Sequence, residues 1–152
     1  MDFTVDEMWQ PPSGTPEMGR FNPVGISYLY MSDTEKTVIS ELKESGRFTI
    51  LKTYMTRKST VLDISKLNGY IFELCNKQKV GNIAKPNEYP IPNYIVQCCS
   101  FLSKERNVEI EGIKYRSSII ENTGYNYVFF NKFRDSFNKE EIIPNGCFHA
   151  QS

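Results

Sequence analysis

Three residues near the start of this chain could together hold a phosphorylated, ring-bearing ligand beside an acid. Arg20, Tyr30 and Glu41 all lie in the segment 19–42, GRFNPVGISYLYMSDTEKTVISEL. An arginine meets phosphate oxygens with a fixed fork of donors, and an aromatic face can stack on a planar heterocycle. A carboxylate can stabilise an oxocarbenium-like transition state or hold a ribose hydroxyl. These residue types fit cleavage of an N-glycosidic bond whose cationic leaving group departs neutral, because no general acid is then needed.

Each of these residues also has a plainer explanation, as a surface arginine, a core tyrosine or a solvated glutamate. Glu41 is the most informative, because the helical repeat places it on the same flank of its predicted helix as Thr34 and Thr37, at the edge of the apolar stripe. A second candidate segment, KYRSS, lies far downstream. Ser117 should face the same side of its predicted strand as Tyr115, although strand serines usually satisfy a backbone group.

Other mechanisms lack the residues that they need. The chain has no GxxxxGK[ST] phosphate loop, no GxGxxG and no GxSxG elbow. Its one histidine, His149, lies three residues from the end, so a Ser-His-Asp triad is poorly supported. No two cysteines form a CxxC pair, so we expect no metal and buried or structural thiols at Cys75, Cys98, Cys99 and Cys147.

Composition limits the class of protein. A chain of 152 residues fits one domain. Its 18 Lys and Arg balance 18 Asp and Glu, so no global field attracts nucleic acid or an anionic membrane. No run reaches the ~18 apolar residues of a membrane helix, and no signal peptide is recognisable. We expect a cytoplasmic protein with neither nucleic acid nor membrane as a partner, and leave a homo-oligomer open.

The order of predicted elements favours an α+β fold. An irregular arm over 1–18, anchored by Met8 and Trp9, should precede a single domain over 19–152. Helices and short strands mix there without the regular βαβ alternation of a doubly wound sheet. The patterns predict strands over 26–31, 47–54, 61–64, 112–120 and 125–131, and helices over 33–45, 67–76 and 91–106.

Local signals refine these elements. Ser32 is predicted as the N-cap of the 33–45 helix because Glu35 follows at capping-box spacing, with Gly46 as its stop. The polar segment 77–90 predicts an exposed loop, and the tail from Lys132 has only weak preferences. The apolar side of the 91–106 helix should pack on a sheet through Ile91, Tyr94, Ile95, Cys98 and Leu102.

The motif GRFNPVGISYLYMS…ISEL, followed by GIKYRSS and GYNYVFFN, resembles the RES domain family, named for an Arg, a Glu and a Ser. The resemblance covers roughly residues 8–131 and is strongest over 19–131. It implies an ADP-ribosyltransferase-like fold, with mixed and antiparallel sheets flanked by helices, that uses NAD and no metal. One departure is Pro92-Asn93-Tyr94, which stands where a polar pair such as Thr-Gln is expected before the long helix.

Matched residue by residue, the resemblance implies Arg20, Glu41 and Ser117 as the catalytic residues. Arg20 is then expected to engage the NAD phosphates and Tyr30 to stack near the nicotinamide ribose, with Ser117 also at the NAD site. Ser118, which is adjacent, is the alternative for the motif serine. The family also includes longer proteins with an extra N-terminal domain, so this chain could be the catalytic portion of something larger.

The resemblance also implies a partner and a choice of activities. Family members act as the toxin half of bacterial toxin–antitoxin pairs, neutralised by a small protein with a helix-turn-helix domain. The first hypothesis is an NAD glycohydrolase or an NAD phosphorylase, the latter using inorganic phosphate. The second is a protein ADP-ribosyltransferase, and the third is a non-catalytic interaction module. All four motif residues being present argues against the third, and the sequence does not separate the first two.

Overall fold

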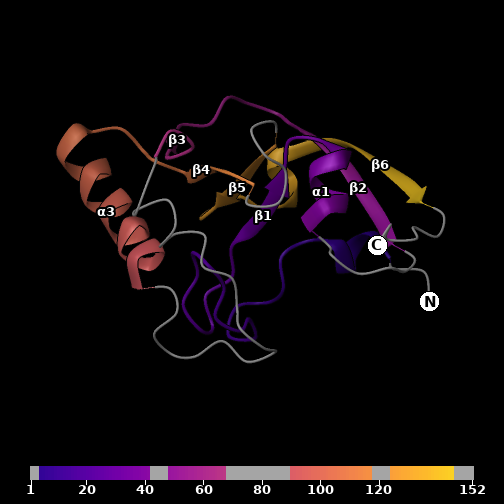
Figure 1. Ribbon diagram of the computed structural model, residues 1–152, viewed down its shortest axis with the longest axis horizontal. Helices are drawn as coiled ribbons and strands as arrows, with labels where there is room; N and C mark the ends of the chain where they lie inside the picture. The colour runs from indigo at the N-terminus through magenta and orange to yellow at the C-terminus, as the bar shows by residue number, and fades with distance from the viewer. Residues whose placement is uncertain (1–3, 42–47, 68–89, 118–123, 146–152) are drawn as a thin grey trace.

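The computed structural model describes residues 4–41, 48–67, 90–117 and 124–145 (Figure 1). Helices and strands mix in two separate sheets, so the α+β prediction is confirmed. No helix within these ranges is long and apolar enough to cross a membrane. The elements in chain order are η1 (Val5–Met8), β1 (Leu29–Ser32), α1 (Glu35–Glu41), β2 (Phe48–Met55), β3 (Val61–Asp63), α3 (Pro90–Arg106), β4 (Gly112–Arg116), β5 (Tyr125–Phe129), η2 (Arg134–Ser136) and β6 (Phe137–Asn145).

The larger sheet has the strand order β1-β5-β4-β3. Neighbouring strands are antiparallel except β3 and β4, which are parallel. Because side chains two residues apart in a strand point to the same face, the register arranges one face in rows. One row holds Tyr30, Val128 and Ile113, and the next holds Ser32, Asn126 and Tyr115.

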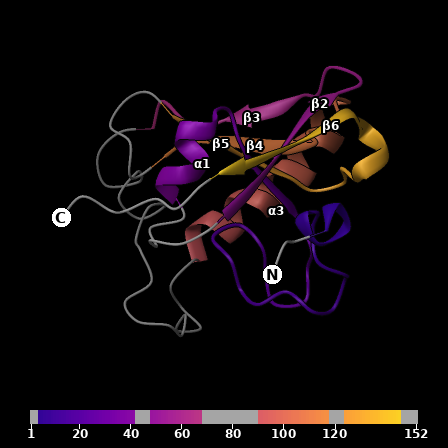
Figure 2. The same cartoon turned by 90° about the vertical axis from the view of Figure 1, so that its right-hand side faces the viewer.

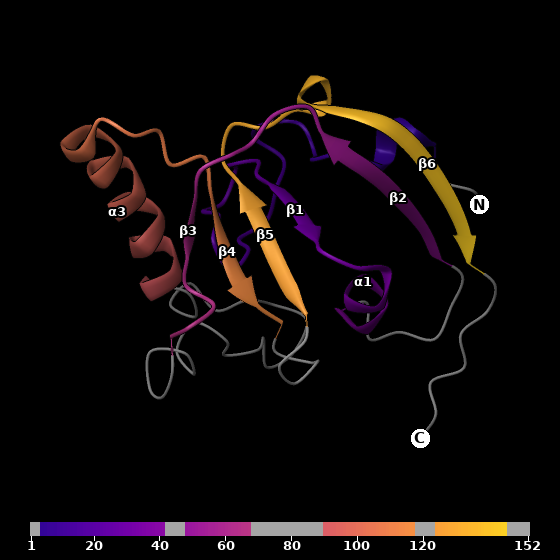
Figure 3. The same cartoon turned by 90° about the horizontal axis from the view of Figure 1, so that it is seen from above.

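A hydrophobic core lies on each face of this sheet. On the face with these rows, residues of β4 and β5 pack with Phe21 and with Val96 and Cys99 of α3. The second core joins Leu29 and Phe129 to Phe137 of β6. β2 and β6 form a separate antiparallel pair. Figure 3 shows α3 on one side of the large sheet and the β2–β6 pair on the other, and in Figure 2, seen along that direction, the β2–β6 pair crosses in front of α3.

Helix α1 begins later than predicted, and Ser32 is not its N-cap. Ser32 closes β1, paired with Asn126, and its hydroxyl donates to the Asn126 side chain. Thr34 caps the helix instead, because its Oγ1 accepts a hydrogen bond from the Thr37 N–H at 3.2 Å. The predicted end of this helix and Gly46 lie outside the described residues.

The apolar side predicted for α3 is only partly right. Ile95 packs against the core, but Tyr94 is 65% exposed. Val96 and Cys99 supply the buried contacts, so the packed side is rotated from the predicted stripe. The exposed Tyr94 belongs to the segment that departs from the family motif.

The remaining segments differ mainly in their ends. The strands predicted over 26–31, 112–120 and 125–131 are shorter in the structure, with residues 118–120 undescribed. The helix predicted over 67–76 and the loop over 77–90 lie almost wholly outside the described residues. The tail from Lys132, for which only weak preferences were expected, contains the nine-residue strand β6.

The N-terminal arm contacts the body of the protein through Trp9, as predicted. The Trp9 and Phe137 rings lie 5.4 Å apart between centroids. The Gln10 amide donates to the Lys132 carbonyl at 2.8 Å. Arm residues thereby cover the end of the sheet where β5 leads into β6.

Candidate functional site

The carboxylate of Glu41 is fixed by two hydrogen bonds from neighbouring strands. The Ser117 hydroxyl donates to Oε1 at 2.6 Å, and the Asn126 side-chain amide donates to the same oxygen at 2.8 Å. Oε2 accepts no hydrogen bond from the part of the chain that the structure describes. One carboxylate oxygen is therefore anchored by neutral donors, and the other has no donor within the described ranges.

Three elements meet to build this contact. Figure 3 shows α1 at the edge of the sheet where β1 and β4 end and β5 begins. Ser117 directly follows β4, and its N–H donates to the Gly124 carbonyl just before β5. Glu41 is the last residue of α1. The residues are far apart in sequence and come together because antiparallel strands bring their ends to one edge.

Helix α1 is seated closely on the sheet through polar residues. Thr37 is 1% exposed, and it is the one buried residue of this helix. Its hydroxyl donates to Asp33 at 2.9 Å. A Cβ added to Gly124 would lie 2.7 Å from the Thr37 hydroxyl, so only glycine allows this approach. Glu41 stands one turn beyond Thr37, on the flank that the helical repeat predicts.

Asn126 carries a second interaction that sets its orientation. The Ser32 hydroxyl donates to Asn126 Oδ1 at 2.5 Å. The Asn126 Nδ2 group must then face Glu41, because the amide has one oxygen and one nitrogen. Ser32, Asn126, Glu41 and Ser117 thus form a continuous chain of hydrogen bonds along the row of the sheet.

Arg20 approaches the same face from the segment before β1. Its guanidinium carbon lies 5.4 Å from the centre of the Tyr115 ring, within the range of a cation–π contact. The next residue, Phe21, is fully buried, and its ring packs against the Tyr115 ring with 4.9 Å between the ring centroids. The Tyr115 ring therefore contacts the Arg20 guanidinium, and the buried Phe21 ring anchors the backbone next to Arg20.

Tyr115 connects the arginine to the acid. Burial raises the pKa of Tyr115 to about 12, the Arg20 charge opposes that rise, and the Glu41 charge adds to it. Both charges are therefore close enough to act on one phenol. Arg20 and Glu41 therefore both lie near Tyr115, and Ser117 contacts Glu41.

Tyr30 lies in the row next to this group. The residue as a whole is 40% exposed. Its hydroxyl is the buried end, accepting from the Phe21 N–H at 3.1 Å and donating to Asn22 at 2.9 Å. Burial of that hydroxyl raises the pKa of Tyr30, and the Phe21 hydrogen bond opposes the rise.

The structure brings all four predicted site residues to one face and one edge of the sheet. Sequence reasoning did not single out Tyr115 or Asn126 as site residues. A signal for Asn126 was present in YNYVFF, because it shares its strand face with the core residue Val128. A polar side chain on the core side of a strand needs a partner, and Asn126 finds Glu41. Ser118, the alternative serine, lies outside the described residues.

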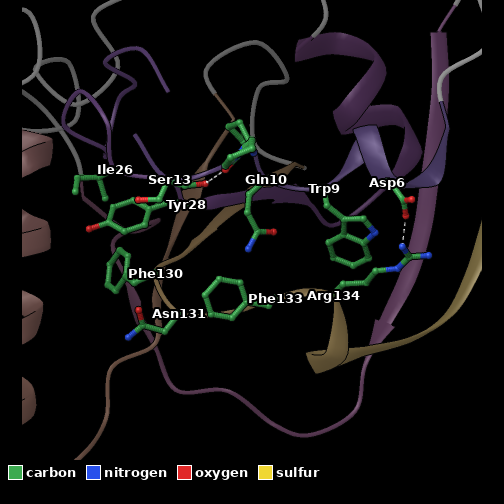
Figure 4. A pocket seen from close by; sticks show the side chains of 13 residues that line it. Asp6, Trp9, Gln10, Ser13, Ile26, Tyr28, Phe130, Asn131, Phe133 and Arg134 are labelled. Carbon is green, nitrogen blue, oxygen red and sulfur yellow. Dashed lines mark hydrogen bonds and ion pairs between the residues drawn. The ribbon is translucent and has the colours of Figure 1, made fainter. Parts of the chain in front are cut away.

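A large cavity lies farther along the sheet and contains none of the four predicted residues. It measures about 680 Å³ and lies between the N-terminal arm and the segment after β5 (Figure 4). Tyr28 and Phe130, whose ring centroids lie 5.1 Å apart, form part of its wall. Among the described residues, no group of His, Cys, Asp and Glu could hold a metal ion.

The fold and these contacts define a class of protein. It is a two-sheet α+β domain in which an arginine, a glutamate and a serine from separate segments converge near the buried Tyr115. The RES domain family model matches residues 2–151, so the chain belongs to the RES domain family. That family is one of NAD-utilising, toxin-like domains. Neither a search of curated proteins nor one of solved structures finds a match to this chain.

Proposed function

We propose that this protein is an NAD-consuming enzyme that cleaves the bond between nicotinamide and ribose. The observation that carries the proposal is the Glu41 carboxylate, with Oε1 held by Ser117 and Asn126 and Oε2 left without a donor among the described residues. A fixed anion of this kind is what a developing oxocarbenium ion needs. Its hydrogen bonds come from uncharged groups, so the negative charge remains available to the ligand.

The other residues fit distinct parts of NAD. Arg20, held over Tyr115, engages the diphosphate. The ring of Tyr30, a residue that is 40% exposed, stacks near the nicotinamide ribose. Ser117 and Asn126 position Glu41. No residue of this group has to act as a general acid, because nicotinamide leaves as a neutral molecule.

The bond change is balanced without a further cofactor. The C1′–N bond breaks, and its electron pair returns to the pyridinium ring, whose positive charge disappears. A nucleophile oxygen then bonds to C1′, and its proton is released to solvent. Water yields ADP-ribose in a glycohydrolase, and inorganic phosphate yields ADP-ribose-1-phosphate in a phosphorylase. A protein side chain as acceptor would make the enzyme an ADP-ribosyltransferase.

Membership of the RES family supports a biological role as the toxin of a toxin–antitoxin pair. The partner is then a small antitoxin with a helix-turn-helix domain. Such a role fits the chemistry, since loss of NAD arrests a cell.

One assay tests the reaction and separates its versions. The purified chain is incubated with NAD, with and without inorganic phosphate, and the products are identified by mass spectrometry. Free nicotinamide with ADP-ribose-1-phosphate shows phosphorolysis, and nicotinamide with ADP-ribose in both conditions shows hydrolysis. Nicotinamide release only when a protein extract is added, with label from NAD on protein, shows ADP-ribosyl transfer. NAD that stays intact under all three conditions would leave the non-catalytic module as the better description.

A further inference from the structure

The turn that carries Arg20 is closed by hydrogen bonds to Tyr30. The Tyr30 hydroxyl accepts from the Phe21 N–H at 3.1 Å and donates to Asn22 Oδ1 at 2.9 Å. The Gly19 N–H donates to the Asn22 carbonyl at 3.1 Å, which completes the turn. Arg20 thus lies between Gly19, whose N–H is bound by the Asn22 carbonyl, and Phe21, whose N–H is bound by the Tyr30 hydroxyl.

Asn22 is a fixed part of this turn. It is 5% exposed, and its amide nitrogen donates to the Glu17 carbonyl at 3.0 Å and to the Pro23 carbonyl at 3.3 Å. Those two acceptors settle which end of the amide is nitrogen, so Oδ1 must face Tyr30.

Gly19 makes room for this arrangement. A Cβ added there would lie 2.1 Å from Asn22 Oδ1 and 3.2 Å from the Tyr30 hydroxyl. Any larger residue would push apart the two atoms that form the hydrogen bond. The sequence GRFNP therefore combines a small residue, the arginine and the asparagine in one local unit.

The Tyr30 hydroxyl is fully engaged by these contacts. Its single hydrogen is given to Asn22, and it accepts from Phe21. Burial also raises its pKa, so the phenol stays protonated at neutral pH. The ring therefore remains the part of Tyr30 that can contact a ligand, while the hydroxyl binds Phe21 and Asn22.

We propose that Asn22 and Tyr30 are positioning residues that act through Arg20. The Tyr30 hydroxyl and the Asn22 amide, which we call the Arg20 clamp, hold the turn so that the guanidinium stays over Tyr115 before ligand arrives. Tyr30 thereby has a second role, distinct from ring stacking, and Asn22 shares it. The kinetic consequence of this role rests on the proposed function, whereas its structural consequence does not.

Tyr30→Phe separates the two roles of Tyr30, because it removes the hydroxyl and keeps the ring. A clamp that presets Arg20 lowers the cost of ordering the NAD-bound state. We expect Tyr30→Phe to raise KM for NAD about tenfold, the effect of one lost hydrogen bond, with kcat changed less than about threefold. Asn22→Ala, which breaks the clamp from the other side, should do the same.

Arg20→Ala supplies the reference for this effect. If the clamp acts through Arg20, adding Tyr30→Phe to Arg20→Ala should raise KM little further, because neighbouring residues in one network are not additive. Tyr28→Phe is the matched control, since Tyr28 lies on the same face, where its ring packs against Phe130 rather than against the turn. An unchanged KM in Tyr30→Phe, or full additivity with Arg20→Ala, would overturn the proposal.

A second measurement does not depend on NAD. Hydrogen exchange of the Phe21 amide, followed by NMR, reports the hydrogen bond to Tyr30 directly. Exchange should become about tenfold faster in Tyr30→Phe, and remain at the wild-type rate in Tyr28→Phe, with the β5 amides as internal reference. If the wild type does not use NAD, the proposed function fails and the Phe21 rate still decides the clamp. Equal Phe21 rates in Tyr30→Phe and wild type would show that no clamp exists.

Discussion

Strand β4 has a glutamate at each end, and the two are held in opposite ways. Glu111 directly precedes the strand, and Glu41 contacts Ser117, which directly follows it. Glu111 is 5% exposed, and its Oε1 forms ion pairs with Lys132 Nζ at 2.7 Å and with Arg57 Nη2 at 2.6 Å. Glu41 instead accepts hydrogen bonds from the Ser117 hydroxyl and the Asn126 side-chain amide, both uncharged. One carboxylate is matched by positive charge, and the other contacts only uncharged donors among the described residues.

The difference distinguishes a structural carboxylate from one suited to a ligand. The backbone of Glu111 is also fully used, since its N–H donates to Thr60 and its carbonyl accepts from Phe130. Only 2% of the Lys132 side chain is exposed, and its ammonium group contacts the Glu111 carboxylate. A buried ion pair of this kind holds segments in register. Burial alone is therefore a poor guide to function here, and the charge of the partners is the better one.

Glu41→Gln should produce the largest effect on activity. Glutamine can keep Oε1 as the acceptor for Ser117 and Asn126, so the fold is preserved while the charge is lost. We expect NAD turnover to fall by about 10²–10³-fold, with the free energy of unfolding changed by less than about 1 kcal/mol. Product formation and urea unfolding measure the two quantities. Glu35→Gln, in the first turn of the same helix, is the control, and a Glu41→Gln enzyme as active as this control would refute the role of Glu41.

Glu111→Gln should do the reverse. It leaves Lys132 buried without a matching charge, and breaking such a pair typically costs about 3–5 kcal/mol. Urea unfolding should show that loss, while NAD turnover of the fraction that remains folded stays near the wild-type value. Adding Lys132→Met should restore much of the stability, because the uncompensated charge is then gone. A loss of turnover in folded Glu111→Gln would mean that the two ends of β4 are not separate.

Sequence patterns predicted the part of the site that depends on local periodicity. The helical repeat placed Glu41 on the flank with Thr37, and strand alternation placed Ser117 with Tyr115; both placements are found in the structure. The family motif added Arg20 and Tyr30 as candidates. These features depend on a few neighbouring residues, whose geometry is set by the regular backbone.

Features that depend on distant pairing were missed. Strand β6 is polar and largely exposed, and Lys139 with φ of 53° interrupts its alternation, so its pairing with β2 left no local pattern. Ser32 fits a capping box by spacing, but its pairing with Asn126 across the sheet keeps it in β1. The clamp role of Asn22 likewise needs Tyr30, eight positions away, to fold back on it. Tertiary contacts decided each of these cases.

The dependence of folding stability on acidic pH tests the role of the Glu111 ion pair, and it is the smallest of the expected effects. Burial alone would raise the pKa of Glu111, but the hydrogen bonds and charge of Lys132, with Arg57, lower it from 4.5 to about 2. A group whose pKa is lower in the folded state stabilises the protein above its unfolded pKa. That stabilisation is fully present above about pH 4.5 and is lost progressively as pH falls towards 2.

We therefore expect Glu111 to contribute about 2 kcal/mol less to stability at pH 3 than at pH 7, from about 1.36 kcal/mol per pKa unit. Other carboxylates titrate in the same range, so the quantity to measure is the difference between wild type and Glu111→Gln in urea unfolding at both values. That difference should narrow at pH 3, because folding must then remove a proton from Glu111 to form the ion pair, which offsets part of its advantage over a neutral glutamine. If the difference in free energy of unfolding between wild type and Glu111→Gln stays constant from pH 7 to pH 3, the Glu111 charge does not stabilise the buried Lys132.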